Sequence, residues 1–179
     1  VEGWSTIEVV QTIRGKKGTE VLLGIIHLGQ DKVEHVSINR GEIDLTSVFW
    51  NMTADKYAYL NLRYFYKNSD ESLIEAIEDI SQLGARGIIL DLRDNPGGLL
   101  TTVVTIASQF LEDGVVVYEV DGYGDRKNWE VESDGVAKDI PMVVLVNQFS
   151  ASASEVLSGA LQDHERALVV GTTTYGKGS

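Results

Sequence analysis

Two residues near the end of the chain have side chains suited to acyl transfer, Ser152 and Lys177. Ser152 directly precedes an apolar helical pattern, so its hydroxyl is expected at the N-terminus of a helix. Lys177 comes 25 residues later and stands between two glycines. A serine hydroxyl becomes an effective nucleophile only beside a base, and a lysine with a lowered pKa can be that base. The two residues therefore predict a serine–lysine catalytic pair.

The three histidines of the chain are poorly placed to serve Ser152. His27 and His35 belong to an N-terminal hairpin pattern, whereas His164 ends the helix that Ser152 begins. About 12 residues of helix would separate His164 from Ser152 by roughly 18 Å, which is too far for proton transfer. Lys177 follows the next strand pattern, so its loop can return to the sheet edge where Ser152 lies.

Both members of the pair also have structural interpretations. Ser152 and Glu155 have the spacing of a capping box, and a lysine between glycines is typical of a surface turn. Residues 171–177 also fit the start of a phosphate-binding loop, but Gly178 occupies the position at which Ser or Thr would hold magnesium. A capping serine is compatible with a nucleophile, because the positive end of a helix favours developing negative charge.

Two loops contain backbone amides that could stabilise an oxyanion. Ala153, next to Ser152, supplies one N–H group. Gly97 or Gly98, which follow the buried strand pattern 88–92, could supply the other. An ordinary strand-to-helix turn would explain the two consecutive glycines equally well.

The elements around these loops predict an α/β fold with a largely parallel sheet, because strand and helix patterns alternate. Both loops follow strands directly, and sites in parallel sheets form at the carboxyl ends of strands. The polar stretch 121–139 is expected to be an excursion or an exposed hairpin around Trp129. The strand patterns cover residues 57–66, 88–92, 115–120, 142–146 and 167–170, and the helical patterns cover 70–83, 99–111 and the stretch after Ser152.

The first 40 residues form a separate pattern. A helix beginning near Ser5 precedes two strands, Glu20 to Leu28 and Val33 to Ile38, which read as a hairpin. One helix and two strands are too little for a stable domain. We therefore expect a boundary near residue 40, with residues 41–179 forming the main domain.

Composition argues against several classes of function. A net charge of -12, from 27 acidic and 15 basic side chains, disfavours nucleic acid as a partner. Cysteine is absent, so there is no thiol nucleophile, disulfide or thiolate metal site. No histidines or carboxylates have convincing metal-ligand spacing, and no run of about 18 apolar residues could span a membrane. We expect no metal and no organic cofactor.

Three motifs, in this order, resemble the carboxyl-terminal processing peptidases, a serine–lysine family also called tail-specific proteases. The motifs are DLRDNPGGL at 91–99, SASASE at 150–155 and YGKG at 175–178. The resemblance covers most of the chain, and residues 1–40 are similar to the second half of the family's PDZ domain. It implies a crotonase-like (ClpP/crotonase) protease core over residues 41–179.

The resemblance also assigns roles by position. It implies that Ser152 is the nucleophile, that Lys177 is the general base, and that the amides of Gly98 and Ala153 form the oxyanion hole. Asp163 matches an acidic position that the family associates with its active site, although a structural role is equally compatible. The family orients its lysine with a glutamine four residues later, so the chain is expected to be a piece of such a protease.

The implied activity is cleavage of protein or peptide substrates near their free C-terminal tails, by acyl transfer and without a metal. The resemblance further implies the bacterial cell envelope as the location, either periplasmic or extracytoplasmic, with anchoring through an upstream segment. It is compatible with a homo-oligomer. Two alternatives remain: a non-catalytic peptide-binding or scaffold fragment, and a crotonase-like acyl-CoA enzyme that uses paired amides without a nucleophile.

Overall fold

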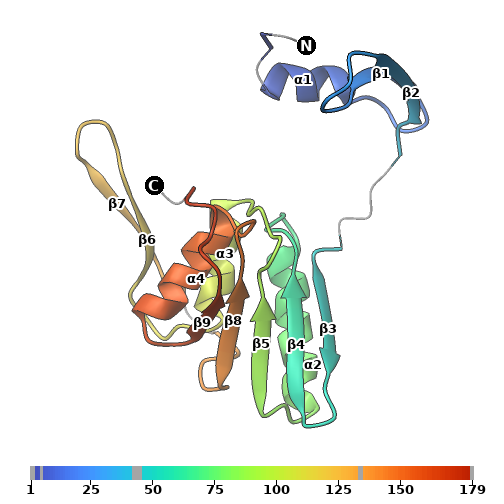
Figure 1. Cartoon of the computed structure of the whole chain (residues 1–179). Coiled ribbons are helices and arrows are strands. Elements are labelled where there is room, and N and C mark those ends of the chain that lie inside the picture. Colours follow the sequence, from blue (N-terminus) through green and yellow to red (C-terminus); the bar gives the residue numbers. More distant parts are fainter. Residues whose placement is uncertain (1–2, 5, 42–45, 133–134, 178–179) are drawn as a thin grey trace. The chain divides into compact units, whose positions relative to one another are not determined.

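The computed structural model describes residues 3–4, 6–41, 46–132 and 135–177, and the chain divides into two units, Val1–Leu45 and Thr46–Ser179 (Figure 1). The first unit contains helix α1 (Thr6–Ile13) and the antiparallel strands β1 (Glu20–Ile26) and β2 (Val33–Asn39). The predicted helix and hairpin are therefore confirmed, except that Ser5 lies outside the described residues.

The first unit has no buried side chain among its described residues. Leu22 and Ile26 of β1 are 64% and 61% exposed. The main link between helix and hairpin is the guanidinium of Arg40, which donates to the carbonyl oxygens of Ile13 (2.8 Å) and Glu20 (3.0 Å). Hydrogen bonds therefore hold this unit together, and the residues that the structure describes form no apolar core in it.

The second unit is built on a five-stranded sheet in the order β3-β4-β5-β8-β9. The four strands β4, β5, β8 and β9 pair in parallel, and β3 joins β4 as an antiparallel hairpin. The prediction of a largely parallel α/β sheet is confirmed, and β3 is an additional edge strand that the sequence patterns did not reveal. The strands are β3 (Val48–Met52), β4 (Tyr57–Leu62), β5 (Gly87–Asp91), β8 (Met142–Val146) and β9 (Leu168–Gly171).

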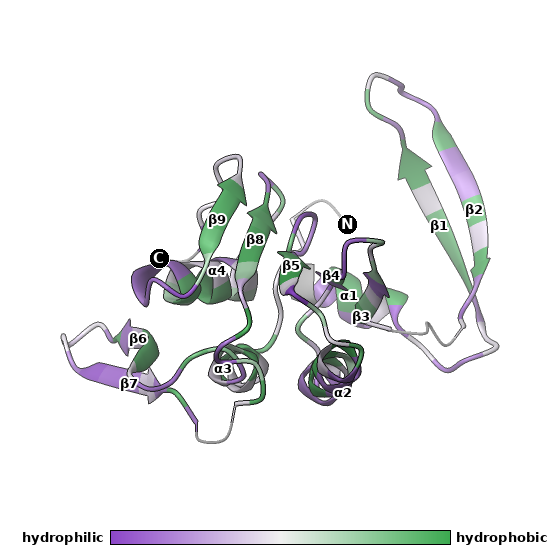
Figure 2. Ribbon diagram, turned by 90° about the horizontal axis from the view of Figure 1, so that it is seen from below, coloured by the Kyte–Doolittle hydropathy of each residue, from purple (hydrophilic) through white to green (hydrophobic). Residues whose placement is uncertain are grey.

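Three helices cover one face of this sheet. Helix α2 (Ser69–Gln82) packs on β3 and β4, helix α4 (Ala153–Asp163) packs on β9, and helix α3 (Leu100–Ser108) contacts both helices. Figure 2 shows α2 and α3 beneath the sheet. Leu60, Leu90 and Val144, from three adjacent strands, are completely buried against this layer. Burial of apolar area here is the main stabilising term of the unit.

Strands β6 (Val115–Val120) and β7 (Arg126–Glu130) form a separate antiparallel ribbon that projects from the helical side (Figure 1). A hairpin that contains Trp129 is present, but its arms are residues 115–120 and 126–130, so it begins earlier than the predicted stretch 121–139. The expectation that residues 115–120 would extend the main sheet is wrong. Strand β8 takes the place beside β5 instead, and Tyr118 and Val120 of β6 are left more than half exposed.

Candidate functional site

The ends of β5 and β8 bring two loops together, as the sequence predicted. Asp91 pairs with Leu145 in the parallel register, so both strands stop at the same edge of the sheet. The amide of Ala151 donates to the carbonyl oxygen of Asn95 at 3.0 Å. The hydroxyl of Ser150 donates to the carbonyl oxygen of Leu92 at 2.7 Å. These bonds join loop 92–98 to loop 147–152 over a long separation in sequence.

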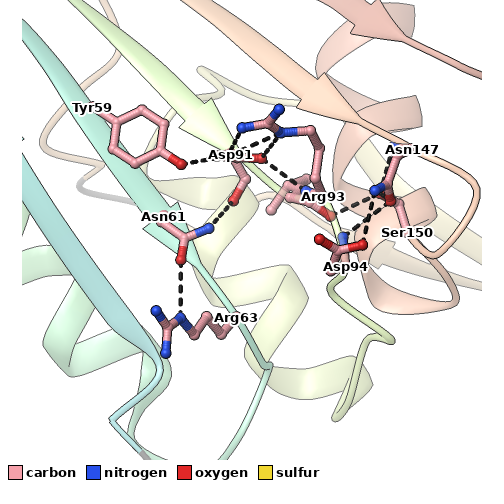
Figure 3. A network of polar contacts seen from close by, with 9 residues as sticks. Tyr59, Asn61, Arg63, Asp91, Arg93, Asp94, Asn147 and Ser150 are labelled. Carbon is pink, nitrogen blue, oxygen red and sulfur yellow. Dashed lines mark hydrogen bonds and ion pairs between the residues drawn. The ribbon is translucent and has the colours of Figure 1, made fainter.

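Asp94 and Asn147 make a reciprocal contact between the same loops (Figure 3). The Asp94 amide donates to Oδ1 of Asn147 at 3.0 Å, and Nδ2 of Asn147 donates to Oδ1 of Asp94 at 2.9 Å. Oδ1 of Asn147 also accepts from the amide of Phe149 at 3.1 Å. Asn147 therefore shapes its own turn and holds the neighbouring one.

Asp91 is a buried carboxylate at the base of this network, with only 2% of its surface exposed. Nη2 of Arg93 lies 2.6 Å from Oδ2 of Asp91, and the Tyr59 hydroxyl donates to the same oxygen at 2.5 Å (Figure 3). Burial raises the pKa of Asp91, but the hydrogen bonds from Arg93 and Tyr59 outweigh burial and hold this pKa below its ordinary value. The carboxylate therefore stays ionised and structural.

Asn95 fixes the glycine turn that follows. Its side chain is completely buried, with Nδ2 donating to the carbonyl oxygen of Leu62 at 2.7 Å and Oδ1 accepting from the Gly97 amide at 2.8 Å. Gly97 has a φ of 96°, and a Cβ there would lie 2.6 Å from the carbonyl oxygen of Ala151 and 2.8 Å from Cβ of Ser152. Only glycine can bring this backbone so close to the proposed nucleophile.

The structure distinguishes Gly98 from Gly97 as the second amide. The Gly97 amide is already bonded to Asn95, whereas the Gly98 amide has no partner within the described residues. Phe65 bonds on either side of Gly98, donating to Gly97 at 3.1 Å and accepting from Leu99 at 2.8 Å. Gly98 is therefore held on both sides while its own N–H remains available.

Ser152 lies at a strained turn. Its φ of 56° and ψ of -116° are rare for a residue with a side chain, and it is the N-cap of α4 with the predicted capping box present. The amide of Ala153, the next residue, has no partner in the described chain. Such strain concentrates at functional sites, where the surrounding structure holds it.

The three serines of the motif differ in what their hydroxyls do. Ser150 and Ser154 are completely buried and donate to the carbonyl oxygens of Leu92 and Asn95. The hydroxyl of Ser152 donates to no acceptor in the described part of the chain, and its side chain is only partly buried. Of the three, Ser152 is therefore the one whose hydroxyl is not donated to a backbone carbonyl oxygen in the described chain, and its role as nucleophile stays a prediction.

The loop after β9 returns to the same edge, because β9 runs parallel to β8. The Tyr175 amide donates to the carbonyl oxygen of Ser150 at 3.0 Å. Lys177 lines a shallow, largely apolar pocket together with Ala151, the residue before Ser152, and with Phe149 and Tyr175. The ion pairs of the described residues do not include Lys177.

Glu155 joins residues 174–177, called here the lysine loop, to the N-terminus of helix α4, where Ser152 lies. Its Oε2 accepts from the amides of Ser152 and Lys177, both at 2.8 Å. Its Oε1 accepts from the Thr174 hydroxyl at 2.8 Å and from the Gly176 amide at 2.6 Å. Burial raises the pKa of Glu155, but these hydrogen bonds outweigh it and hold the pKa below its ordinary value.

Sequence reasoning recognised Glu155 only as a capping residue. The capping-box spacing accounts for its bond to Ser152, three residues earlier. The three bonds to residues 174–177 reach across the sheet edge, and no local spacing reveals them. Asn95 was missed for the same reason, because its partners are fixed by the tertiary fold.

Asp163 lies far from Ser152 along α4, although it lines the same groove as Glu155. It ends α4, 11 residues after Ser152, which corresponds to about 16 Å of helix. It lines a groove between α4 and the β6–β7 ribbon, together with Arg126. His164 is also far from Ser152, with Nε2 lying 3.0 Å from the carbonyl oxygen of Val115.

The described residues contain no cluster of three metal-ligating His, Cys, Asp or Glu side chains. None of their helices combines the length and apolar character needed to cross a bilayer.

Comparison with known proteins agrees with this geometry. Residues 56–179 match the family described as Peptidase family S41. The carboxyl-terminal-processing protease of Synechocystis sp. is 38% identical over 175 residues, covering 96% of this chain and 41% of the relative. The carboxy-terminal processing protease CtpA of Bacillus subtilis is 34% identical over 180 residues, covering 100% of this chain and 38% of the relative.

A solved structure described as photosystem II D1 C-terminal processing protease superposes with a TM-score of 0.78 and 28% sequence identity. The match covers 99% of this chain and 50% of that one. The chain thus spans about two fifths of the length of the curated relatives. With its strained serine, its paired glycines and most of its length matched by the family, this chain belongs to peptidase family S41.

Proposed function

We propose that this chain carries the catalytic centre of a serine endopeptidase in which Ser152 is the nucleophile and Lys177 the general base. The observation that carries the proposal is the pair of amides without partners among the described residues, Gly98 and Ala153, beside the strained turn of Ser152. Preorganised N–H donors without other partners are what an oxyanion requires. Lys177 lines a pocket with Ala151, the residue before Ser152, and no described carboxylate forms an ion pair with its ammonium group.

The geometry supports an acyl-transfer sequence. Oγ of Ser152 attacks the carbonyl carbon of the scissile bond, and Nζ of Lys177 accepts the hydroxyl proton. The amides of Gly98 and Ala153 donate to the oxyanion. The intermediate expels the amine, which takes the proton from Lys177. Water, deprotonated by the same lysine, then hydrolyses the acyl-enzyme and regenerates Ser152.

The substrate class follows from the relatives and the pocket. Because relatives are named carboxyl-terminal-processing proteases, the proposed substrates are protein or peptide chains cut near free C-terminal tails. The pocket beside Lys177, of roughly 540 Å³, has mostly apolar walls and would accept an apolar substrate side chain. Those walls include Tyr64, Pro96, Phe149 and Tyr175, and the charged side chains of Asp94 and Lys177 lie at the same pocket.

The proposal includes the finer features implied by the resemblance. These are a crotonase-like core, residues 1–40 as half of a PDZ domain, a location in the bacterial cell envelope and assembly as a homo-oligomer. The first unit's helix-and-hairpin arrangement is compatible with a part of a larger domain, since its apolar side chains remain exposed.

A serine-directed fluorophosphonate probe tests the catalytic pair. We expect this chain to be labelled at Ser152, labelling to be lost in Ser152→Ala, and labelling to slow at least 100-fold in Lys177→Ala. Ser81→Ala, on the exposed side of α2, is the matched control and should label normally. Circular dichroism verifies that each variant is folded.

Three results would contradict the proposal. Labelling that survives Ser152→Ala would place the nucleophile elsewhere. A folded chain that is never labelled would favour the scaffold alternative. Thioester turnover that survives Ser152→Ala would favour the acyl-CoA alternative.

A further inference from the structure

We propose that Glu155 is a positioning residue that couples the base to the nucleophile. Its carboxylate would hold residues 174–177 against the N-terminus of α4, so that Lys177 stays within reach of Ser152. The catalytic consequence of this contact depends on the proposed function. The contact itself is a structural claim and can be tested separately.

One oxygen atom links the two catalytic residues. Oε2 of Glu155 accepts from the backbone amide of Ser152 and from that of Lys177, each at 2.8 Å. The two amides therefore share an acceptor, and the positions of both backbones are fixed relative to a single atom. Hydrogen bonds to a carboxylate are shorter and stronger than those to a neutral acceptor, which makes this bridge stiff.

The end of the lysine loop depends on Glu155 more than on any other described residue. Before this end, the Tyr175 amide donates to Ser150. After Tyr175, the amides of Gly176 and Lys177 both donate to Glu155, and before it the hydroxyl of Thr174 does so too. Lys177 itself is exposed, so apolar packing does not hold it. Without the carboxylate, this segment would keep one backbone bond at Tyr175 and few other constraints.

The arrangement positions the lysine without pairing with its ammonium group. Glu155 receives backbone and hydroxyl donors on both oxygens, and no described carboxylate lies within ion-pair distance of Nζ of Lys177. A direct ion pair would stabilise the ammonium form of the lysine and impair it as a base. The four donors also match the roughly four acceptor sites of a carboxylate, so Glu155 has no acceptor site left for Nζ.

Glu155→Gln is the direct test, because glutamine keeps the shape but replaces one acceptor oxygen with an NH₂ group. We expect hydrogen exchange of the Gly176 and Lys177 amides to accelerate at least tenfold. The amide of Leu92, which donates to Leu145 in the sheet, should exchange as before. Fluorophosphonate labelling of Ser152 should slow about 100-fold, and the pH midpoint of the labelling rate should move.

The pH readout must account for the other charged groups near this carboxylate. Asp163 of α4 and Arg126 of the β6–β7 ribbon line the same groove, as does the phenol of Tyr118. Tyr175 and Lys177 lie in the loop. Glu165→Gln, just beyond α4 and exposed, is the matched control, and it should alter neither exchange nor labelling.

Normal exchange at Gly176 and Lys177 in Glu155→Gln would overturn the proposal, even if labelling were lost. If the unchanged chain were never labelled, the catalytic proposal would fail while the exchange rates would still decide the structural claim. If Glu155→Gln does not fold, Thr174→Val removes one of the four donors. It should accelerate exchange at Gly176 several-fold, and an unchanged rate there would contradict the proposal.

Discussion

The two sides of the candidate site are held in different ways. On the nucleophile side, Asn95, Ser150 and Ser154 are completely buried, and their hydrogen bonds join two loops that are also part of the core. On the base side, Lys177 is exposed, and its loop is fastened largely through Glu155. The difference predicts that the nucleophile side contributes to global stability, whereas the base side affects reactivity with little effect on stability.

The largest expected effect comes from Gly98→Ala. A Cβ at this position would overlap the carbonyl oxygen of Phe65, which is backbone and cannot rotate away. We expect a loss of about 3 kcal/mol in the free energy of unfolding, as for severe overpacking. If the Gly98 amide is the proposed oxyanion donor, labelling of Ser152 should also fall at least 100-fold, because that amide is displaced. Urea denaturation and probe labelling measure the two effects.

Gly159→Ala provides a matched comparison. Gly159 lies inside α4, where an added Cβ would have no atom of another element within 4 Å, so alanine should stabilise the chain by about 0.5–1 kcal/mol. If Gly98→Ala and Gly159→Ala changed the free energy of unfolding equally, backbone movement would have to relieve the crowding at Gly98.

The buried ion pair of the nucleophile side should give a smaller, pH-dependent effect. Asp91→Asn removes the charge that Arg93 and Tyr59 contact, and we expect a loss of about 2 kcal/mol near pH 7. The folded-state pKa of Asp91 is lowered, so its contribution is present above the ordinary pKa and is lost as the pH falls through the folded value. The stability difference between the two proteins should therefore shrink below about pH 4.

Thermal denaturation of both proteins between about pH 2 and pH 8 measures this stability difference on either side of the ordinary pKa of an aspartate. Asp94→Asn, at the neighbouring exposed carboxylate, is the matched control variant and is measured over the same pH range. A difference that grew on acidification would contradict the assignment of Asp91 as an ionised, stabilising group.

Ser152→Gly should raise stability while abolishing labelling. Glycine adopts a φ of 56° without strain, so we expect a gain of about 1 kcal/mol over Ser152→Ala, which keeps the strain. Melting temperatures of the two variants provide the comparison. If alanine were as stable as glycine here, the turn would not be strained in solution.

The smallest expected stability effect is that of Lys177→Ala. The side chain is exposed and has no ion pair among the described residues, so the free energy of unfolding should stay within about 0.5 kcal/mol of the original. Labelling should nevertheless be strongly slowed. A large loss of stability would mean that the base side is as integral to the fold as the nucleophile side.

Much of this arrangement could be predicted because local patterns determine it. The apolar runs at 88–92 and 142–146 identified two buried strands, and the loops after them were expected at one edge because parallel strands end together. Ser152 was expected at a helix N-terminus from the capping spacing alone. Strand 48–52 was missed, since its half-exposed apolar pattern is weak and its pairing with β4 is set by tertiary contacts.

The sequence by itself determined the parallel sheet, the order of the two loops and the candidates Ser152 and Lys177, since all of these depend on residue types and spacing. The tertiary structure alone decided which serine hydroxyls donate to buried carbonyl oxygens, which glycine has an amide without a partner in the described chain, and that Glu155 joins residues 174–177 to the N-terminus of α4. These depend on hydrogen bonds between residues far apart in the chain. Such bonds become specified only when the strands have packed and their ends meet.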